Sequence, residues 1–410
     1  MSQETLAMSQ KERERLVVLE RVKSGELLLK EAAWEMELSL RQTVRLNKRY
    51  QRDGAEGLVH QSRGLPSNRR CPPEFKRRVL EIYRERYRGF GPTLACEKMA
   101  ECEGIVLSHE TLRRWLIEEG LWQCGAKERV HRRQRKRRER FGELLQIDGS
   151  DHAWFEERGP RSTLLVLVDD ATGRVRLHMA EAETTRAALT VLHKWVKAYG
   201  VPVSIYADRR TVYFTETFLH EPDRRRDPAV FTEFMQVTDR LGISMIAAYS
   251  PQAKGRVERM NGTLQDRLVK ELRLRGVSTI EEANAMLDAF ADDLNCRFAR
   301  EPLRPADAHR AAPRGRAQWE AFFCTEKSRV VQKDNTVSLK GEQWQILKQP
   351  GAPRPGEKAL WRRPLFGEAG WFWQGKRLRT RNLGPKQKPA SRPASPTRGG
   401  QPPHPRDLSP

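Results

Sequence analysis

The sequence predicts a chain of several domains: two all-α units, a mixed α/β domain, a small β-barrel and a disordered basic tail. Three observations support this. Residues 8–124 carry apolar residues at helical spacing. From Phe141, short apolar runs alternate with amphipathic stretches, and from Ser328 to Arg379 five strand-like pieces are separated by turns. A chain of 410 residues is long enough for several buried cores.

Residues 8–60 predict a helix-turn-helix unit. Apolar residues at helical spacing run from Glu12 to Ser24 and from Leu29 to Glu37. Ser39 can cap a third helix from Leu40 to about Arg52, which Asp53-Gly54 would end. Three short helices with a tight turn before the third are typical of this motif. Its third helix carries the residues that we expect to contact DNA, namely Arg41, Arg45, Lys48 and Arg49.

The pattern repeats over residues 73–124, after a linker over residues 61–72. Ser108 can cap the last helix of this second unit, on which Arg113 and Arg114 face outward. A pair of helical protein-binding bundles is the alternative interpretation. Basic residues recur on both third helices, which favours DNA binding.

The positive charge is concentrated at the two ends of the chain. The net charge is +22; residues 1–140 contribute +11, residues 141–300 contribute −2 and residues 301–410 contribute +13. An excess of this size favours a polyanionic partner over a merely solvated surface. We therefore expect DNA binding by the ends and another role for the middle.

A basic linker over residues 125–140 precedes the middle domain. It is either a solvated linker helix or an arm that follows the phosphates of DNA, and its position favours the arm. The residues assigned to DNA contact in this linker are Arg132, Arg133, Arg135, Lys136, Arg137 and Arg138.

Residues 141–300 predict a mixed sheet covered by helices. Three strands come first, and strands then alternate with helices. Residues 301–325 are expected to form a connector, residues 326–382 the small β-barrel, and residues 383–410, which are rich in Pro, Ser, Arg and Lys, a disordered tail.

The six cysteines have neither CxxC spacing nor a histidine cluster beside them, so a zinc site is not expected. No signal peptide or membrane span is visible in the sequence. We expect a cytoplasmic protein without a membrane partner.

Three carboxylates stand out in the middle domain. Asp148 ends an apolar run, Asp208 ends a predicted strand, and Glu258 lies in the first turns of a helix. Carboxyl ends of strands and the start of the next helix meet at one edge of an α/β sheet. Converging carboxylates repel one another, and Mg²⁺ relieves that repulsion. Two such ions can drive phosphodiester chemistry, with Asp148 shared between them.

Glu258 also has a plain structural interpretation. It could form a surface ion pair with Lys254, although that order of the two residues is the less favourable one. Its place at the edge of an apolar stripe, between Gly255 and Gly262, favours a site residue. Lys254, Arg256 and Arg259 are then expected to contact phosphate.

The motifs "FGELLQIDGSDHAWFEERGP", "LLVLVDDATGR", "YADRR" and "SPQAKGRVERMNGTLQDRLVKELRLRGVSTIEEAN" resemble bacterial insertion-sequence transposases with a retroviral-integrase-like DDE core. The ISNCY type is the most similar. The resemblance covers residues 8–310, and it implies a ribonuclease-H-like fold. Two departures are visible: "ADRR" replaces the more familiar "DNG", and "ETFLHEPDRRRDPAV" lengthens the spacing between Asp208 and Glu258.

The resemblance also implies an activity. Such enzymes bind the terminal inverted repeats of an element, cut its ends and join the 3′-OH to target DNA. The triad falls on Asp148, Asp208 and Glu258, which would bind two Mg²⁺, with Mn²⁺ as a substitute. Double-stranded DNA and a homodimer or larger synaptic assembly, in the bacterial nucleoid, are the implied partners and setting.

Two other functions remain open at the level of sequence. A catalytically silent or domesticated transposase would bind DNA as a regulator, although all three carboxylates are present. A structure-selective nuclease with a related core would cut DNA without joining it and without preferring element ends.

Overall fold

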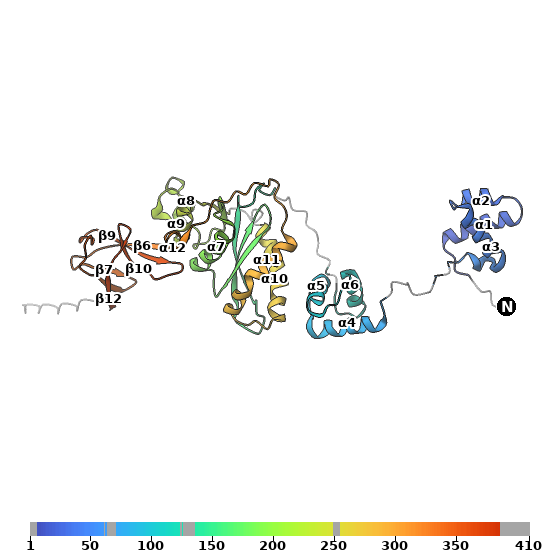
Figure 1. The fold of residues 1–410 in the computed structure, drawn as a ribbon, viewed down its shortest axis with the longest axis horizontal. Helices are drawn as coiled ribbons and strands as arrows, with labels where there is room; N and C mark the ends of the chain where they lie inside the picture. The colour runs from blue at the N-terminus through green and yellow to red at the C-terminus, as the bar shows by residue number, and fades with distance from the viewer. Residues whose placement is uncertain are drawn as a thin grey trace, which may run out of the picture. The chain divides into compact units, whose positions relative to one another are not determined.

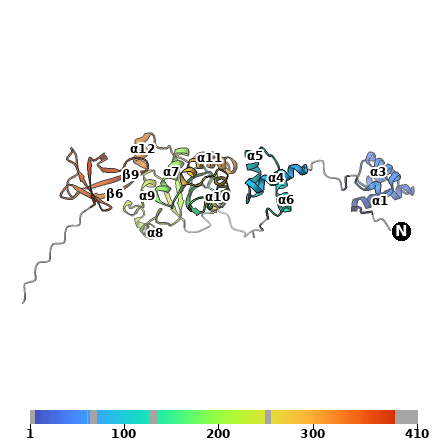
Figure 2. The same cartoon turned by 90° about the horizontal axis from the view of Figure 1, so that it is seen from below.

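The computed structural model describes residues 6–60, 62–63, 71–123, 125, 136–248 and 255–385. The chain forms two compact units, Met1–Cys124 and Gly125–Pro410. Figures 1 and 2 show the elements of both. No helix in the described ranges is long and apolar enough to cross a membrane.

The first predicted helix-turn-helix unit contains three helices. They are α1 (Gln10–Lys23), α2 (Leu29–Glu35) and α3 (Leu40–Asp53), and the short 3-10 helix η1 (Gly54–Leu58) follows. Ser39 caps α3: its hydroxyl accepts a hydrogen bond from the Gln42 backbone N–H at 3.3 Å, and the Gln42 side chain accepts one from the Ser39 N–H at 3.2 Å. A small apolar core of Leu19, Leu46, Tyr50 and Leu58 holds the helices together.

The second unit has the same order of helices: α4 (Pro73–Arg86), α5 (Pro92–Glu103) and α6 (His109–Glu118). Gly104 ends α5 in the left-handed conformation, with φ of 66°. The Ser108 hydroxyl caps α6 by accepting a hydrogen bond from the Thr111 N–H at 3.1 Å. Both predicted capping serines are therefore confirmed.

The middle domain is built on a five-stranded sheet in the order β3-β2-β1-β4-β5. Its strands are β1 (Leu145–His152), β2 (Ser162–Asp169), β3 (Val175–Ala180), β4 (Ser204–Ala207) and β5 (Ser244–Ala247). β1, β2 and β3 pair antiparallel, whereas β1 pairs with β4, and β4 with β5, in parallel. The predicted mixed sheet is confirmed.

Helices cover both faces of this sheet, so β2 is buried along its whole length. Successive side chains of a strand point to opposite faces. Leu165 and Leu167 of β2 pack in one cluster with α7 (Thr185–Tyr199) and α9 (Glu233–Arg240). Leu164 and Val166 pack in the other cluster with α10 (Gly255–Leu274) and α11 (Ile280–Phe298). Figure 1 shows these two layers.

The segment predicted to lengthen the core lies between β4 and α9. It folds as α8 (Glu216–His220) and two short 3-10 helices, η2 (Pro222–Arg224) and η3 (Pro228–Val230). The Thr215 hydroxyl donates a hydrogen bond to the Val230 carbonyl at 2.6 Å and so joins the two ends of the segment.

The predicted connector is more structured than expected. Arg310 forms an isolated β-bridge with Val201, and its guanidinium donates to the carbonyls of Leu241 and Gly242 at 2.8 and 2.7 Å. The helix α12 (Gly315–Phe322) follows, and Phe323 joins the core cluster around α7. The connector therefore packs along the middle domain.

The C-terminal strands form two sheets around one apolar core. One sheet has the order β11-β10-β9-β6 and the other β12-β8-β7. Both contribute to a cluster that contains Val337, Ile346, Ala359 and Trp371. The strands are β6 (Cys324–Val330), β7 (Thr336–Leu339), β8 (Glu342–Ile346), β9 (Lys358–Pro364), β10 (Gly370–Trp373), β11 (Lys376–Arg377) and β12 (Thr380–Pro385).

The predicted start of the tail needs correction, whereas the predicted closure of the barrel is not tested. The tail was expected from residue 383, but β12 extends to Pro385; residues 386–410 lie outside the described residues. Closure of the two sheets into a barrel remains a prediction.

A half-buried histidine makes the stability of the middle domain depend on pH. His193 of α7 packs edge-on against Trp319 and Phe366, and burial lowers its pKa to about 4. The unfolded chain binds this proton near the ordinary value of 6.5, so the contribution of His193 to stability is complete above about pH 6.5 and is lost as the pH falls toward 4.

We therefore expect the thermal unfolding midpoint of the middle domain to fall over that pH range. His193→Phe keeps an aromatic ring against Trp319 and should lose part of the pH dependence. His178, whose pKa burial also lowers to about 4, should supply part of the remainder. An unchanged slope in His193→Phe would show that His193 has no part in the acid sensitivity.

Candidate active site at the carboxyl ends of β1 and β4

Asp148 and Asp208 lie at the same level of two neighbouring parallel strands. Gln146 of β1 pairs with Tyr206 of β4. Asp148 is two residues beyond Gln146, and Asp208 is two residues beyond Tyr206, directly after the end of β4. The sheet thus places these two predicted carboxylates at the same level, Asp148 within β1 and Asp208 just beyond β4.

The helix α10 lies along β1 and contacts every second residue of that strand. The Val257 N–H donates to the Gln146 Oε1 at 3.3 Å. The Asn261 Nδ2 donates to the Asp148 Oδ2 at 3.0 Å, and the Gln265 Nε2 donates to the Ser150 Oγ at 3.2 Å. Four residues of a helix and two residues of a strand cover a similar length, so every fourth residue of α10 meets every second residue of β1.

Glu258 belongs to the first turn of α10, three residues before Asn261, and its side chain is exposed. Residues three apart are neighbours on one helix face. The predicted apolar stripe is confirmed, because Val257, Leu264 and Leu268 are fully buried. A Cβ at Gly255 or Gly262 would meet nothing within 4 Å, so neither glycine serves a close approach of another described backbone segment.

The three predicted carboxylates are not gathered into one coordination shell. Within the described part of the chain, no three His, Cys, Asp or Glu side chains are close enough to hold a metal ion. The donor chemistry nevertheless fits Mg²⁺, which is commonly held by one or two carboxylates together with waters and substrate phosphates. The Asn261 Oδ1, beside Asp148, is also buried without a hydrogen-bond partner among the described residues.

Glu183 is a further carboxylate beside Asp148 and Asp208, and the sequence does not single it out. It lies between β3 and α7, and its side chain is only 7% exposed. The Tyr213 hydroxyl donates to its Oε1 at 2.7 Å, and Arg210 donates to its Oε2. A Cβ on Gly149, the residue after Asp148, would lie 2.5 Å from that Oε2. Glu183 therefore packs directly against the candidate site.

Burial raises the pKa of Glu183, and the charges of Asp208 and Asp148 raise it further, whereas Tyr213 and Arg210 lower it. A signal for Glu183 was present in the strand order. β3 runs in the same direction as β1, because two antiparallel pairings separate them. An acidic residue just past β3 therefore lies toward the same end of the sheet as the carboxyl-terminal half of β1 and the residues that follow β4.

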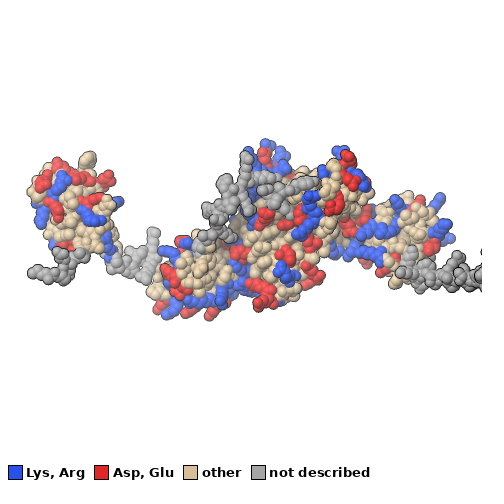
Figure 3. All heavy atoms as spheres, turned by 180° about the vertical axis from the view of Figure 1, so that it is seen from behind, with Lys and Arg blue, Asp and Glu red and all other residues tan. Residues whose placement is uncertain are grey.

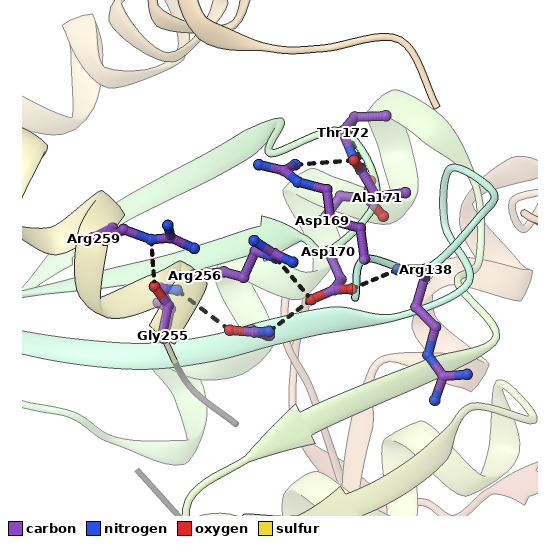
Figure 4. A network of polar contacts seen from close by, with 11 residues as sticks. Arg138, Asp169, Asp170, Ala171, Thr172, Gly255, Arg256 and Arg259 are labelled. Carbon is purple, nitrogen blue, oxygen red and sulfur yellow. Dashed lines mark hydrogen bonds and ion pairs between the residues drawn. The ribbon is translucent and has the colours of Figure 1, made fainter. Parts of the chain in front are cut away.

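The two aspartates that end β2 have structural roles. Asp169 stabilises the turn after β2, because it accepts hydrogen bonds from the Thr172 N–H and hydroxyl, both at 2.7 Å. Asp170 is the centre of a buried network instead. It accepts from the Arg138 N–H at 2.7 Å, the Gln146 Nε2 at 3.0 Å and the Arg256 Nε at 3.3 Å (Figure 4).

This network corrects the prediction for Arg256. Its side chain is only 11% exposed and forms an ion pair with the fully buried Asp170, so it holds the start of α10 to the end of β2. We no longer assign it to DNA contact. Arg259, the neighbouring candidate, is exposed and donates to the Gly255 carbonyl at 2.8 Å (Figure 4).

The other predicted DNA contacts fall into three groups. On α3, Arg41, Arg45 and Lys48 are exposed and Arg49 is half-buried. On α6, Arg114 is exposed, whereas Arg113 pairs with Glu110 at 3.0 Å. In the basic linker, Arg137 donates to the Ala171 carbonyl at 3.0 Å, and the Arg138 side chain points away from Asp170 (Figure 4). Lys136 is exposed, and Arg132, Arg133, Arg135 and Lys254 lie outside the described residues.

Charge is mixed on the face of the middle domain that Figure 3 shows. Lys and Arg alternate there with Asp and Glu, and neither sign covers the surface alone. The near-neutral balance of residues 141–300 agrees with this picture. On this face, the positive charge of the chain is therefore not concentrated over the core.

Two family models match the chain: the homeodomain-like domain over residues 43–116 and the integrase core domain over residues 239–297. Among solved structures, the catalytic core domain of HTLV-2 integrase in complex with magnesium is 20% identical, covering 36% of this chain and 83% of that one, with a TM-score of 0.27. We draw no conclusion from a likeness of that size.

Two relatives are similar over most of their length. The first, named "Putative transposase y4bF" of Sinorhizobium fredii, is 40% identical over 335 residues, which cover 82% of this chain and 72% of that protein. The second, the transposase for insertion sequence IS1202 of Streptococcus pneumoniae, is 32% identical over 324 residues, or 70% of this chain and 68% of that protein. Identity at this level over more than two thirds of both proteins means that the chain belongs to the bacterial insertion-sequence transposases of the DDE/integrase superfamily, DNA-binding polynucleotidyl transferases.

Proposed function

We propose that this transposase binds the terminal inverted repeats of an insertion sequence, cleaves the element ends and joins each 3′-OH to target DNA. The observation that carries the proposal is the placement of Asp148 and Asp208 at one level of β1 and β4, with α10 beside them. Mg²⁺ bound there would activate the attacking oxygen and stabilise the leaving one in phosphodiester transfer.

We assign the metal-binding role to Asp148, Asp208 and Glu258. Asp148 is held by Asn261, so one of its oxygens has a fixed direction. Glu258 lies one turn before Asn261 and reaches solvent, where a substrate strand can approach it. Two Mg²⁺ ions, with Mn²⁺ as a substitute, would offset the mutual repulsion of the carboxylates of Asp148, Asp208 and Glu258.

The helix-turn-helix units would recognise the element ends. Arg41, Arg45 and Lys48 project to solvent at spacings of four and three residues, so they share one face of α3. Such a face is suited to the major groove and its phosphates. We also propose phosphate contacts for Lys136 and Arg259, and for Arg132, Arg133, Arg135 and Lys254, which lie outside the described residues.

This assignment predicts a salt-dependent loss of affinity. Arg45→Ala and Lys48→Ala should each weaken binding to a terminal-repeat duplex, and the slope of log affinity against log salt should become shallower by about one for each lost phosphate contact. Fluorescence anisotropy at several salt concentrations measures both quantities. Arg13→Ala, on the exposed side of α1, removes the same charge and should leave both unchanged.

Joining two element ends requires both to be held at once. We therefore propose a homodimer or a larger synaptic assembly on DNA. Light scattering with and without terminal-repeat duplexes tests this point, because a single protomer on each duplex at all concentrations would contradict it.

The proposed reaction is tested with a labelled terminal-repeat oligonucleotide, supercoiled target DNA and Mg²⁺. Cleavage followed by joining supports the proposal. Cutting that ignores the repeat sequence and never joins would point to a structure-selective nuclease. Tight binding of the repeat without any cleavage, in Mg²⁺ or Mn²⁺, would point to a silent transposase that regulates through DNA binding.

A further inference from the structure

We propose that Glu183 is a positioning residue for Asp208 and that it acts through Arg210. This inference rests on the proposed function, because it concerns how one metal-binding carboxylate is oriented. It adds two residues, Glu183 and Arg210, and a supporting tyrosine, Tyr213, to the site.

Glu183 is the fixed member of this group of residues. Glu183 has a buried side chain that is held from two sides. The Tyr213 that donates to its Oε1 is itself fully buried and packs edge-on against Phe234. A buried carboxylate requires hydrogen bonds or a cation to offset its desolvation, and Tyr213 and Arg210 provide both. The carboxylate of Glu183 is therefore fixed in position.

Arg210 connects Glu183 to Asp208. The guanidinium of Arg210 contacts Glu183 through Nη1, and its Nε lies 3.0 Å from the Asp208 Oδ2. One planar side chain thus bridges a buried carboxylate and a half-buried one. Such a fork fixes the direction of both partners, which the point charge of a lysine does not do.

The segment "ADRR" also orients Asp208 through its own residues. Asp208 is the first residue after the end of β4. In "ADRR" the backbone N–H of Arg210 lies 3.4 Å from the Asp208 Oδ1, and the side chain of Arg210 turns back to the Oδ2. In this loop, which departs from the usual "DNG", Arg210 therefore contacts both carboxylate oxygens of Asp208 and orients them.

Metal affinity tests this inference, because groups that orient metal-binding side chains typically change affinity about 10- to 100-fold when removed. The full-length chain is titrated with Mn²⁺, and the free ion is counted by its electron paramagnetic resonance signal. Arg210→Lys keeps the charge but loses the fork, and Tyr213→Phe keeps the ring but loses the bond to Glu183. Each should weaken Mn²⁺ binding about 10-fold.

Arg209→Lys is the matched control, since the same change is made at the neighbouring exposed position; it should bind Mn²⁺ as the wild type does. Thermal unfolding identifies variants that fail to fold, and the half-exposed Arg210 should tolerate lysine. Wild-type affinity in both Arg210→Lys and Tyr213→Phe would overturn the inference.

Glu183→Gln and Asp208→Asn separate the remaining outcomes. If Glu183→Gln abolishes Mn²⁺ binding while Arg210→Lys does not affect it, Glu183 is a ligand, and the positioning role is wrong. If Asp208→Asn leaves Mn²⁺ binding unchanged, the proposed metal site itself fails. A loss in Asp208→Asn with graded losses in Arg210→Lys and Tyr213→Phe is the result expected here.

Discussion

Asp148→Asn, Asp208→Asn and Glu258→Gln are each expected to lower cleavage and joining by about a thousandfold or more, while binding to terminal repeats stays close to wild type. The metal-bound oxygens supply several kcal/mol of transition-state stabilisation, and each 1.36 kcal/mol corresponds to a factor of about ten in rate. Amide side chains keep the shape of the carboxylates but lose the negative charge that a divalent cation requires.

The control for this prediction is Asp151→Asn. Asp151 belongs to the same strand as Asp148, but it is exposed and pairs with Arg161 at 3.2 Å. Single-turnover assays with a pre-cut repeat should show wild-type joining in Asp151→Asn. Wild-type joining in any of the three site variants would remove that residue from the proposed site.

Arg256→Met is expected to destabilise the middle domain by about 3–5 kcal/mol, because it removes the ion pair between Arg256 and the fully buried Asp170. The hydrogen bonds that Asp170 accepts from the Arg138 N–H and the Gln146 amide do not replace a positive charge. Methionine has a similar length, so the loss of packing adds little.

Arg259→Met separates this structural role from DNA contact. It makes the same change on the same helix at an exposed side chain, and it should alter the free energy of unfolding by less than about 0.5 kcal/mol. Chemical denaturation and DNA binding are measured on both variants. We expect Arg256→Met to lose stability and Arg259→Met to lose DNA affinity; the reverse pattern would restore Arg256 as a phosphate contact.

Local signals predicted many element boundaries well. The helix expected from Leu40 to Arg52 runs from Leu40 to Asp53, since Ser39 caps it and Gly54 stops it. These signals lie within a few residues of the boundary they set. Helix α12 was missed, since its N-cap is Arg314, which gives no capping signal, Pro313 precedes it, and its first residue is Gly315.

The candidate site could be predicted only in part, for a different physical reason. Asp148 and Asp208 could be placed because both belong to recognisable strand segments: Asp148 lies within β1, and Asp208 comes directly after β4. Arg256 was misassigned, because its partner Asp170 is far away in the sequence and only the packing of α10 on the sheet joins them. Glu183 and Glu181 lie in the same short connection, and only the folded contact with Gly149 and Tyr213 distinguishes them.

The proposal that Asp148, Asp208 and Glu258 share a metal site is tested most directly by anomalous scattering from crystals of the protein grown with Mn²⁺ and a terminal-repeat duplex. The account predicts a Mn²⁺ peak between Asp148 and Asp208, the Glu258 carboxylate turned toward the metal site, and Glu183 still bonded to Tyr213 and Arg210. A peak remote from Asp148 and Asp208, or one ligated by Glu183 in place of Glu258, would contradict it.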